Sequence, residues 1–542
     1  MNPFSISGNI IDLENQRIFK GTIHVKNGKI VDIEENENNN SQYILPGFID
    51  AHVHVESSMI IPSEFARIAV THGTVATISD PHEIANVLGI EGVKYMLNNG
   101  KKVPFKFYFG APSCVPATIH ETAGSTLGVE DVEELLKMDE IVYLAEMMNF
   151  PGVLFKDPEV MEKIRLAHQY HKVVDGHAPG LRGEDARKYI EAGISTDHEC
   201  FTAEEALDKL KYGMKIIIRE GSAAKNFEAL IDLMNNHSEM MMFGSDDKHP
   251  NDLVAGHINT HVKRALQKNI PLMKVLRASS YNTIKHYGMK VGLLQKGDDA
   301  DFIVIDNIED FNVLQTYING EMVAEKGTSN ISSVKTDIVN NFDCKKINVS
   351  DIQIPADSQK IKTIEVTDGQ LITKEGSATL KKTNDFLHSD TDQDILKLVV
   401  VNRYKTAPPA ICFVKNFGIK KGALASSVAH DSHNIIATGV SDEDIVNAIN
   451  LVIENTGGVS AACGAFQDIL PLPIAGLMSA DDGYKVAEKY EYLDKKIKEW
   501  ECTLNSPYMT LSFLALLVIP ELKLSDKGLF DGKTFQFTSV YL

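Results

Sequence analysis

Two histidines two positions apart, His52 and His54, are the residues of this chain best placed to bind a metal ion together. They lie at the end of a β-rich stretch, in the segment 45–56. Side chains at positions i and i+2 of a strand point to the same face, so both imidazoles can reach one ion. Such a pair also occurs on ordinary protein surfaces. The rest of the chain must decide between these two interpretations.

Ligand-type side chains recur where later strands are predicted to end. Glu146, His177, His198 and Asp246 each lie within two residues of the end of a predicted strand. Taken singly, each has an ordinary explanation as a core histidine, a helix cap or a turn residue. The carboxyl ends of barrel strands converge on one site, so together with the histidine pair they predict a metal centre. Imidazole mixed with carboxylate suits a divalent manganese, iron or zinc ion.

The elements that must position these side chains follow from alternating patterns between residues 46 and 285. Short β-like stretches alternate with helix-like ones, which predicts β/α units around a parallel sheet. The strand that carries the two histidines is followed by seven others, at 74–79, 105–109, 141–145, 173–176, 194–196, 215–218 and 240–244. Eight strands over about 240 residues is the length of a closed (β/α)8 barrel. A doubly wound sheet is the alternative, but no glycine-rich phosphate loop follows the first strand.

The flanks of this barrel are predicted to form two further domains. Residues 1–45 contain short strands with a hairpin turn at Asn27-Gly28, and residues 286–330 become strand-like again. We expect these two segments to pair in a small β domain. A polar linker near 326–340 leads to residues 340–542, which are long enough for a C-terminal α/β domain. The expected fold class is therefore α/β, a distorted TIM barrel at 46–285 with these two additions.

The composition restricts the class of partner. The chain has 542 residues and a formal net charge of −20, which disfavours a nucleic acid or an anionic membrane surface and favours a small-molecule substrate. Its six cysteines form no CxxC pair, so we predict no disulfide framework and expect a reducing cytoplasm. The N-terminus lacks a secretory signal pattern, and the longest apolar stretch, 513–519, is too short to span a membrane.

Five motifs together resemble a known family. They are PGFIDAHVHVESS at 46–58, SDPHEIANV at 79–87, PSCVPAT at 112–118, AEMM at 145–148 and AHDSHN at 429–434. The set covers nearly the whole chain and resembles the adenine deaminase family of the amidohydrolase superfamily, whose fold is a distorted barrel with a small β domain. Many superfamily members bridge two metals with a carbamylated lysine from strand four. Glu146 stands there in this chain, which is typical of the adenine deaminases.

The resemblance implies hydrolytic deamination of adenine to hypoxanthine and ammonia, in purine salvage in the cytoplasm, with two divalent ions per chain. Manganese or iron is expected, with zinc as an alternative. A divalent ion lowers the pKa of a water that it holds toward neutrality. By analogy with the superfamily, one ion is held by His52, His54, Glu146 and Asp246, and the second by Glu146, His177 and His198.

The resemblance also assigns proton-transfer roles. Asp246 would act as general base and then general acid, with Asp247 as the neighbouring alternative. The purine ring must gain a proton at N1, and the candidate donors are Glu121, and Glu83 together with His82. The cluster at 430–433, beyond the barrel, could bind a third ion, close over the substrate or simply lie on a turn.

Other functions stay open from the sequence alone. One is a different amidohydrolase on the same scaffold. A cyclic amide hydrolase normally uses the strand-four lysine that is absent here, and an N-acetyl sugar deacetylase would not need the long C-terminal segment. Another is a non-catalytic relative that binds a purine or a partner protein, although such a relative would be expected to have lost ligands. We expect a homo-oligomer, such as a dimer.

Overall fold

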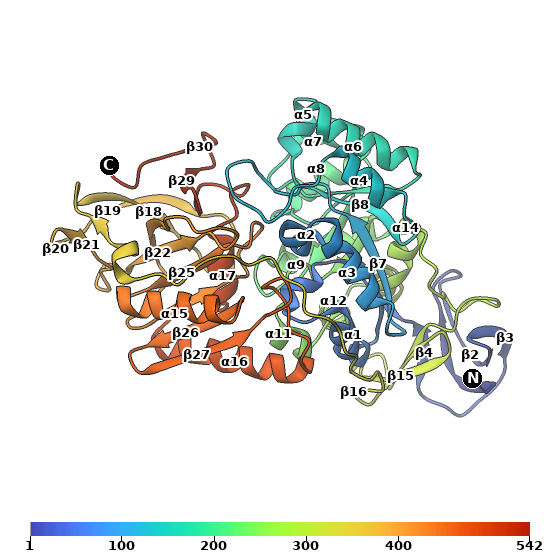
Figure 1. Ribbon diagram of the computed structural model, residues 1–542. Coiled ribbons are helices and arrows are strands. Elements are labelled where there is room, and N and C mark those ends of the chain that lie inside the picture. Colours follow the sequence, from blue (N-terminus) through green and yellow to red (C-terminus); the bar gives the residue numbers. More distant parts are fainter. Residues whose placement is uncertain (1) are drawn as a thin grey trace.

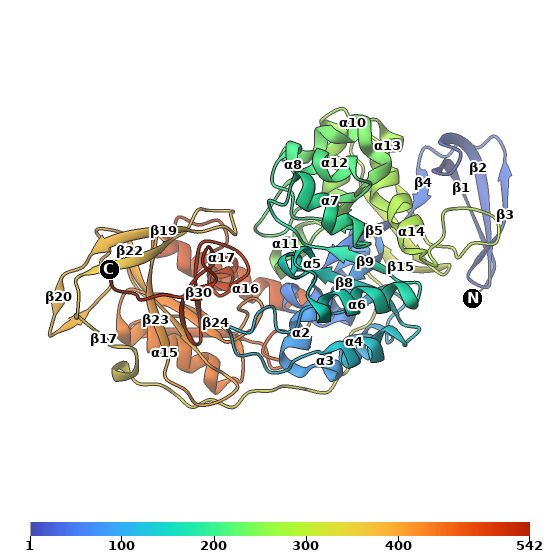
Figure 2. The same ribbon diagram turned by 90° about the horizontal axis from the view of Figure 1, so that it is seen from above.

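The structure, a computed structural model, describes residues 2–542 and consists of three regions in a row (Figure 1). A small β-sheet region that contains the N-terminus lies at one end, a mixed helical and strand region lies in the middle, and the C-terminal region lies at the other end. A view turned by 90° shows the same order (Figure 2). No helix of this described part of the chain is long and apolar enough to cross a membrane.

The central region is built on parallel strands that alternate with helices, as the sequence predicts. One parallel sheet contains β5 (Phe48–Val53), β6 (Thr74–Ser79), β7 (Lys106–Ala111), β8 (Ile141–Met147) and β9 (Val173–Gly176). A second contains β10 (Thr196–Asp197), β11 (Lys215–Arg219) and β12 (Met241–Gly244). Isolated parallel bridges join the two sheets, Val174 to Ile194 at one seam and Val53 to Asp246 at the other. Within residues 2–542 the strands form a curled parallel sheet, whereas the continuous ladder of a closed barrel is not resolved.

The predicted strand positions in this region are confirmed. β6 and β9 begin and end at the predicted residues, and the other strands differ from the prediction by no more than two residues at either end. Every residue of β5, β6 and β12 is buried. Buried parallel strands consist of nearly continuous apolar runs, which is why their positions could be identified from the sequence.

Helices cover the outer side of these strands: α1 (Pro62–Ala69), α3 (Ile90–Gly100), α4 (Val129–Leu136), α6 (Pro158–Gln169), α7 (Gly183–Glu191), α8 (Ala203–Lys211) and α12 (Ile258–Gln267). In α6, Asp157 caps the first turn by accepting hydrogen bonds from the backbone N–H groups of Glu159 and Val160. Val160, Ile164 and Ala167 recur at helical spacing and are buried. This apolar face packs against β8 and β9.

The β-sheet region combines strands from both flanks of the central region. Its sheet has the order β16-β15-β14-β13-β4-β1-β2-β3. These strands are β1 (Phe4–Asp12), β2 (Arg17–Lys26), β3 (Lys29–Glu35), β4 (Tyr43–Pro46), β13 (Phe302–Ile305), β14 (Val313–Ile318), β15 (Glu321–Glu325) and β16 (Thr328–Ser329). Asn27 and Gly28 connect β2 to β3 with φ of 53° and 78°, as a type I′ hairpin turn requires.

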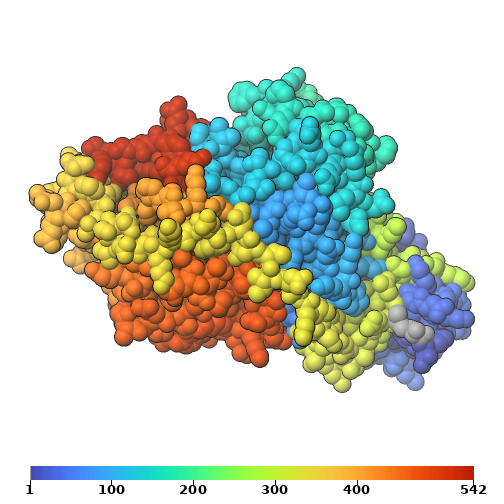
Figure 3. All heavy atoms as spheres, in the orientation of Figure 1, coloured from blue at the N-terminus to red at the C-terminus, as the bar shows by residue number. Residues whose placement is uncertain are grey.

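The C-terminal region has a mostly antiparallel sheet with helices packed around it. The sheet contains β18 (Lys360–Glu365), β19 (Lys374–Thr379), β22 (Ile395–Val401), β23 (Ala410–Lys415), β24 (Ala423–Ser426), β25 (Ile435–Gly439), β26 (Gly458–Cys463) and β27 (Phe466–Pro471). Its helices are α15 (Asp442–Glu454), α16 (Gly483–Glu499) and α17 (Pro507–Phe513). α16 packs against α1 and α11 (Pro250–Ala255) of the central region. Figure 3 shows the connecting residues 330–348, in yellow, running across one face of the molecule.

Candidate metal centre

The predicted metal ligands converge at the carboxyl ends of the central strands. At most 7% of any of them is exposed to solvent. We call these residues the strand-end cluster: His52 in β5, His54 just after it, Glu146 in β8, His177 after β9, His198 after β10 and Asp246 after β12. Parallel strands that curl around a common axis bring their carboxyl ends together, so side chains that are far apart in the sequence become neighbours.

His52, His54 and Asp246 form a first group of ligand atoms. The Nε2 atoms of the two histidines lie 3.2 Å apart. Asp246 Oδ1 lies 3.5 Å from the Nε2 of His52 and 3.2 Å from that of His54. Glu146 Oε1 lies 3.4 Å from His54 Nε2. Ligand atoms about 2.1 Å from a transition-metal ion are roughly 3.0–3.4 Å apart, so the spacing of this group fits one ion.

His177 and His198 form a second group around the other oxygen of Glu146. Glu146 Oε2 lies 2.8 Å from His177 Nδ1 and 3.2 Å from His198 Nε2. Glu199 Oε1 lies 3.5 Å and 3.4 Å from the same two nitrogens. Glu146 therefore faces the first group with one carboxylate oxygen and the second group with the other. This arrangement suits a carboxylate that bridges two ions.

The charges around these side chains favour positive charge in the site. Burial lowers the pKa of His198, but hydrogen bonding to Glu146 and Glu199 outweighs it and raises the pKa to about 10. Burial likewise raises the pKa of Glu146, but His177 and His198 outweigh it and hold that pKa well below its usual range. Buried carboxylates that are this strongly ionised need cations close to them. The donor atoms therefore fit divalent ions in charge as well as in spacing.

Asp246 is held in position by the backbone and by a buried arginine. Its N–H donates to the backbone oxygen of His52 over 2.8 Å, and its φ of 55° lies in the left-handed region that non-glycine residues rarely adopt. Arg219, at the end of β11, contacts the second carboxylate oxygen of Asp246. Burial raises the pKa of Asp246, but Arg219 and the neighbouring histidines outweigh it and bring it well below its usual range. The side chain is thus an ionised carboxylate beside the histidine pair.

Asp247, the neighbouring alternative, has different partners. Its Oδ1 accepts a hydrogen bond from Ser57 Oγ over 2.5 Å and lies 4.0 Å from His430 Nε2. Burial and the charge of Asp246 raise the pKa of Asp247 to about 6. Of the two adjacent aspartates, Asp246 is the one that contacts the histidine pair.

Two of the three predicted proton donors line the cavity beside the strand-end cluster. His82 and Glu83 begin α2 (His82–Leu88) and line the cavity beside it, with His82 Nδ1 3.6 Å from Glu146 Oε1. Glu121 is buried but does not line this cavity. Burial and the nearby charge of Asp431 raise the pKa of Glu121 to about 8. The structure therefore places His82 and Glu83 at the cavity, whereas Glu121 is not among the residues that line it.

Two residues of the site were missed by the sequence reasoning. Glu199 directly follows His198, and Arg219 is the last residue of β11. Arg219 Nη1 lies 2.6 Å from Glu199 Oε1 and also contacts Asp246, so it connects the two groups of ligand atoms. Both residues lie at strand ends. Arg219 directly follows the predicted strand 215–218 and would have been found if cations had been sought at strand ends, whereas Glu199 lies three residues beyond the predicted strand 194–196.

The cavity beside the strand-end cluster has a volume of about 20 Å³ and is shared between two regions of the molecule. The strand ends of the central region form one side. The C-terminal region supplies the other side, and we call these residues the C-terminal cover: Leu371, His430, Asp431, Phe513 and Leu516. The rings of His430 and Phe513 are stacked, with centroids 4.5 Å apart. Part of the 430–433 cluster, whose role was open from the sequence, thus reaches the site.

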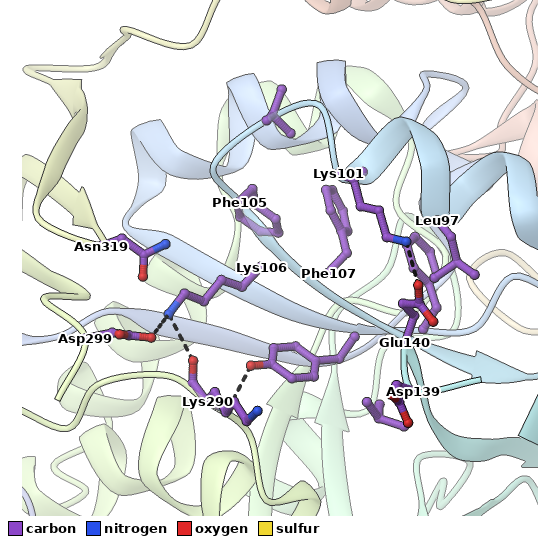
Figure 4. A pocket seen from close by; sticks show the side chains of 15 residues that line it. Leu97, Lys101, Phe105, Lys106, Phe107, Asp139, Glu140, Lys290, Asp299 and Asn319 are labelled. Carbon is purple, nitrogen blue, oxygen red and sulfur yellow. Dashed lines mark hydrogen bonds and ion pairs between the residues drawn. The ribbon is translucent and has the colours of Figure 1, made fainter. Parts of the chain in front are cut away.

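A second cavity lies near the opposite, amino-terminal end of β7 (Figure 4). Two of the lysines that line it form ion pairs. Lys106 Nζ lies 2.7 Å from a carboxylate oxygen of Asp299, and Lys101 Nζ lies 2.7 Å from one of Glu140. These four side chains are already paired, unlike the imidazoles and carboxylates that converge in the strand-end cluster.

Known proteins resemble this chain over both of its larger parts. Residues 43–323 match the Amidohydrolase family, and residues 370–536 match the Adenine deaminase C-terminal domain. The chain is 54% identical over 533 residues to an adenine deaminase of Sulfurovum sp., with 98% of both chains covered. It is 52% identical over 541 residues to an adenine deaminase of Salinibacter ruber, with 99% of both covered. It is 50% identical over 547 residues to an adenine deaminase of Methanosarcina mazei, with 98% of this chain and 99% of that one covered.

Proposed function

Because the chain belongs to the adenine deaminase family of the amidohydrolases, we propose that its strand-end cluster is the centre that hydrolyses adenine to hypoxanthine and ammonia. The observation that carries this proposal is the position of Glu146, whose two oxygens face two separate groups of imidazoles. Four histidines and two carboxylates within one buried site have no simpler explanation in packing, because buried polar groups of this kind are expensive to desolvate.

We also propose how the regions correspond to domains. The two parallel sheets would form one distorted (β/α)8 barrel at 46–285, and the bridges at both seams support its closure. Residues 1–45 and 286–330 would form a small β domain, and residues 340–542 a C-terminal α/β domain. The shared sheet of the flanks supports the first of these assignments.

The donor set is suited to two divalent ions. His52, His54, Asp246 and Glu146 would hold one ion, and Glu146, His177 and His198 the other. Mixed imidazole and carboxylate ligands favour manganese or iron, with zinc as an alternative. When bound, such ions supply a nucleophile at neutral pH by lowering the pKa of water. Glu199 would fix the orientation of His177 and His198 from behind.

Asp246 would move the proton of the attacking water. As the water oxygen forms its bond to C6 of adenine, the carboxylate accepts a proton. It then gives a proton to the amine, which leaves as ammonia when the bond between C6 and the exocyclic nitrogen breaks. In the net reaction, one proton of the water ends on N1 and the other leaves with ammonia. The low pKa that Arg219 and the histidines give Asp246, against the effect of burial, means that it starts as a base.

His82 is the better of the two candidate acids for N1 that line the cavity. Burial lowers the pKa of His82, but the carboxylates of Asp80 and Asp431 outweigh it and raise that pKa well above its usual value. Burial raises the pKa of Glu83, but His430 outweighs it and lowers the net value. At neutral pH His82 therefore carries a proton that it can donate, whereas Glu83 is ionised.

Ammonia release from adenine tests this function. We expect manganese-loaded protein to release one ammonia for each hypoxanthine formed, metal-stripped protein to release none, and added manganese to restore the rate. Absence of release from adenine by protein that carries two ions per chain would overturn the proposal. Release from adenosine but not adenine would instead assign the site to nucleosides.

A further inference from the structure

A loop of the C-terminal region reaches into the active-site cavity and is firmly held there. The loop, residues 427–434, connects β24 to β25. Tyr404 Oη donates to the backbone oxygen of Ser432 over 2.6 Å, and Asn434 Nδ2 donates to that of Thr122, in the central region, over 2.9 Å. The loop is therefore held to its own region through Tyr404 and to the central region through Thr122.

His430 and Asp431 are the two side chains of this loop that line the cavity. His430 Nδ1 lies 2.9 Å from Glu83 Oε1, and its ring stacks on Phe513. Asp431 Oδ1 lies 3.5 Å from His82 Nε2. These contacts orient both side chains toward the substrate side of the strand-end cluster.

Asp431 has one oxygen without a partner. The residue is 3% exposed, and its Oδ2 accepts no hydrogen bond from any residue of the described chain 2–542. Burial raises the pKa of Asp431, but His82 outweighs it, so the carboxylate is ionised. A buried, ionised oxygen at a cavity wall needs a donor, and a bound ligand with an N–H group can provide one.

The remaining cover residues, Leu371, Phe513 and Leu516, are apolar. These three side chains offer an apolar surface to the face of a planar ring.

Free adenine has two kinds of N–H donor. The exocyclic amine is the leaving group and must lie toward the strand-end cluster in the proposed reaction. The other donor is the N–H of the imidazole ring, which adenosine lacks because its ribose occupies that position. A site built around a hydrogen bond rejects analogues that lack the matching group, because its own polar atom is then left unpaired.

We propose that Asp431 accepts a hydrogen bond from the imidazole N–H of the free base, so that the C-terminal region selects nucleobases over nucleosides. Asp431 is then a specificity-determining residue that the central region cannot supply. This inference rests on the proposed function, because it uses the orientation of adenine that deamination requires.

Binding of the product and of its 9-methyl analogue tests the inference without turnover. Calorimetry would measure the affinities of hypoxanthine and 9-methylhypoxanthine for manganese-loaded protein and for two variants, Asp431→Leu and Asp431→Asn. We expect the native protein to favour hypoxanthine by at least about 100-fold. The Asp431→Leu variant should reduce this ratio at least tenfold, and Asp431→Asn, which keeps one acceptor oxygen, should reduce it less.

Asp526→Asn is the matched control. Asp526 lies at the same boundary between regions, where its carboxylate accepts hydrogen bonds from Thr122 N and Asn402 Nδ2, but it does not line the cavity. This variant should keep the native ratio, and all variants should keep two ions per chain. An unchanged ratio in correctly folded Asp431→Leu protein would overturn the inference, since exclusion of the methyl group by shape alone would then explain the preference. The ammonia assay on native protein tests deamination independently. A failure of the Asp431 inference can therefore be distinguished from a failure of the proposed function.

Discussion

The strand-end cluster and the C-terminal cover meet at one cavity, but they are built differently. The cluster consists of ionisable side chains on the ends of parallel strands, and each ligand atom lies within 3.5 Å of another. The cover consists mostly of apolar side chains from loops and from α17, with one buried carboxylate oxygen left without a partner. The difference indicates a division of labour, in which regular strands fix the reacting groups and the added region selects the molecule that reaches them.

The largest effect is expected at the residue that joins the two groups of the cluster. Glu146→Gln removes the shared negative charge while keeping the size of the side chain. We expect metal content to fall below one ion per chain and turnover to fall by about 10⁴-fold, because both ions and the nucleophile they supply depend on that carboxylate. Elemental analysis and ammonia release would measure these changes. A variant that kept both ions and near-native turnover would show that Glu146 is not a bridging ligand.

A smaller loss of turnover is expected when Glu199, which lies behind the strand-end cluster, is replaced. Glu199→Gln weakens the contacts that orient His177 and His198, and it removes the negative charge that pairs with Arg219. Outer partners of metal ligands typically contribute about 10- to 100-fold to metal affinity or activity, and we expect a loss of turnover in that range. The exposed Glu184, which pairs with Arg187, provides the control, and Glu184→Gln should leave turnover unchanged. Equal behaviour of the two variants would contradict a role for Glu199.

The smallest effect is expected at Lys523, which lies behind the C-terminal cover, and it concerns the free energy of unfolding. This buried lysine donates hydrogen bonds to the backbone oxygens of Leu371 and Phe513, over 2.8 Å and 3.0 Å. Burial lowers its pKa to about 7, below the value of 10.5 expected in the unfolded chain. Between these two pH values the unfolded state binds one more proton than the folded state, so this group makes stability rise with pH by about 1.4 kcal/mol per pH unit. Below pH 7 both states bind the proton, and burial of the charged lysine destabilises the folded state by its full amount. Above pH 10.5 neither state binds the proton, and this destabilisation is absent.

Urea denaturation of native protein and of Lys523→Met at pH 7.5 and 9.5 would measure this effect. The native protein should gain stability relative to the variant as the pH rises, because methionine does not titrate. A difference between the two proteins that does not change over this range would show that Lys523 is charged in the folded state.

The two sides of the cavity also differ in how well they could be predicted from the sequence. β6 and β9 begin and end at the predicted residues, because short β-prone runs, TVATIS in β6 and VVDG in β9, alternate with helical patterns there. Once the strands are placed, a histidine or carboxylate at a strand end is predicted to face the site, and His52, His177 and Asp246 could be found in this way. Arg219 was missed because only metal-ligand residue types were sought at strand ends, and Glu199 because it lies three residues beyond the predicted strand 194–196.

Asp431 could not be assigned from any local pattern. Its role depends on how the C-terminal region packs against the central one, through contacts such as that between Asn434 and Thr122. No periodicity in the sequence encodes the distance between a loop of one region and a strand end of another. The motif at 429–434 marked the loop as unusual, but only the structure places it opposite His82.

The most direct test of the proposed reaction compares the two adjacent aspartates, Asp246 and Asp247. In Asp246→Asn we expect turnover with adenine to fall by about 10³-fold, because a general base and acid is lost, while two ions per chain remain bound. In Asp247→Asn, whose carboxylate contacts Ser57 and not the histidine pair, the loss should be much smaller. Retained turnover in Asp246→Asn with its metal content intact, or a larger loss in Asp247→Asn, would contradict the assignment of Asp246 as the residue that moves the proton.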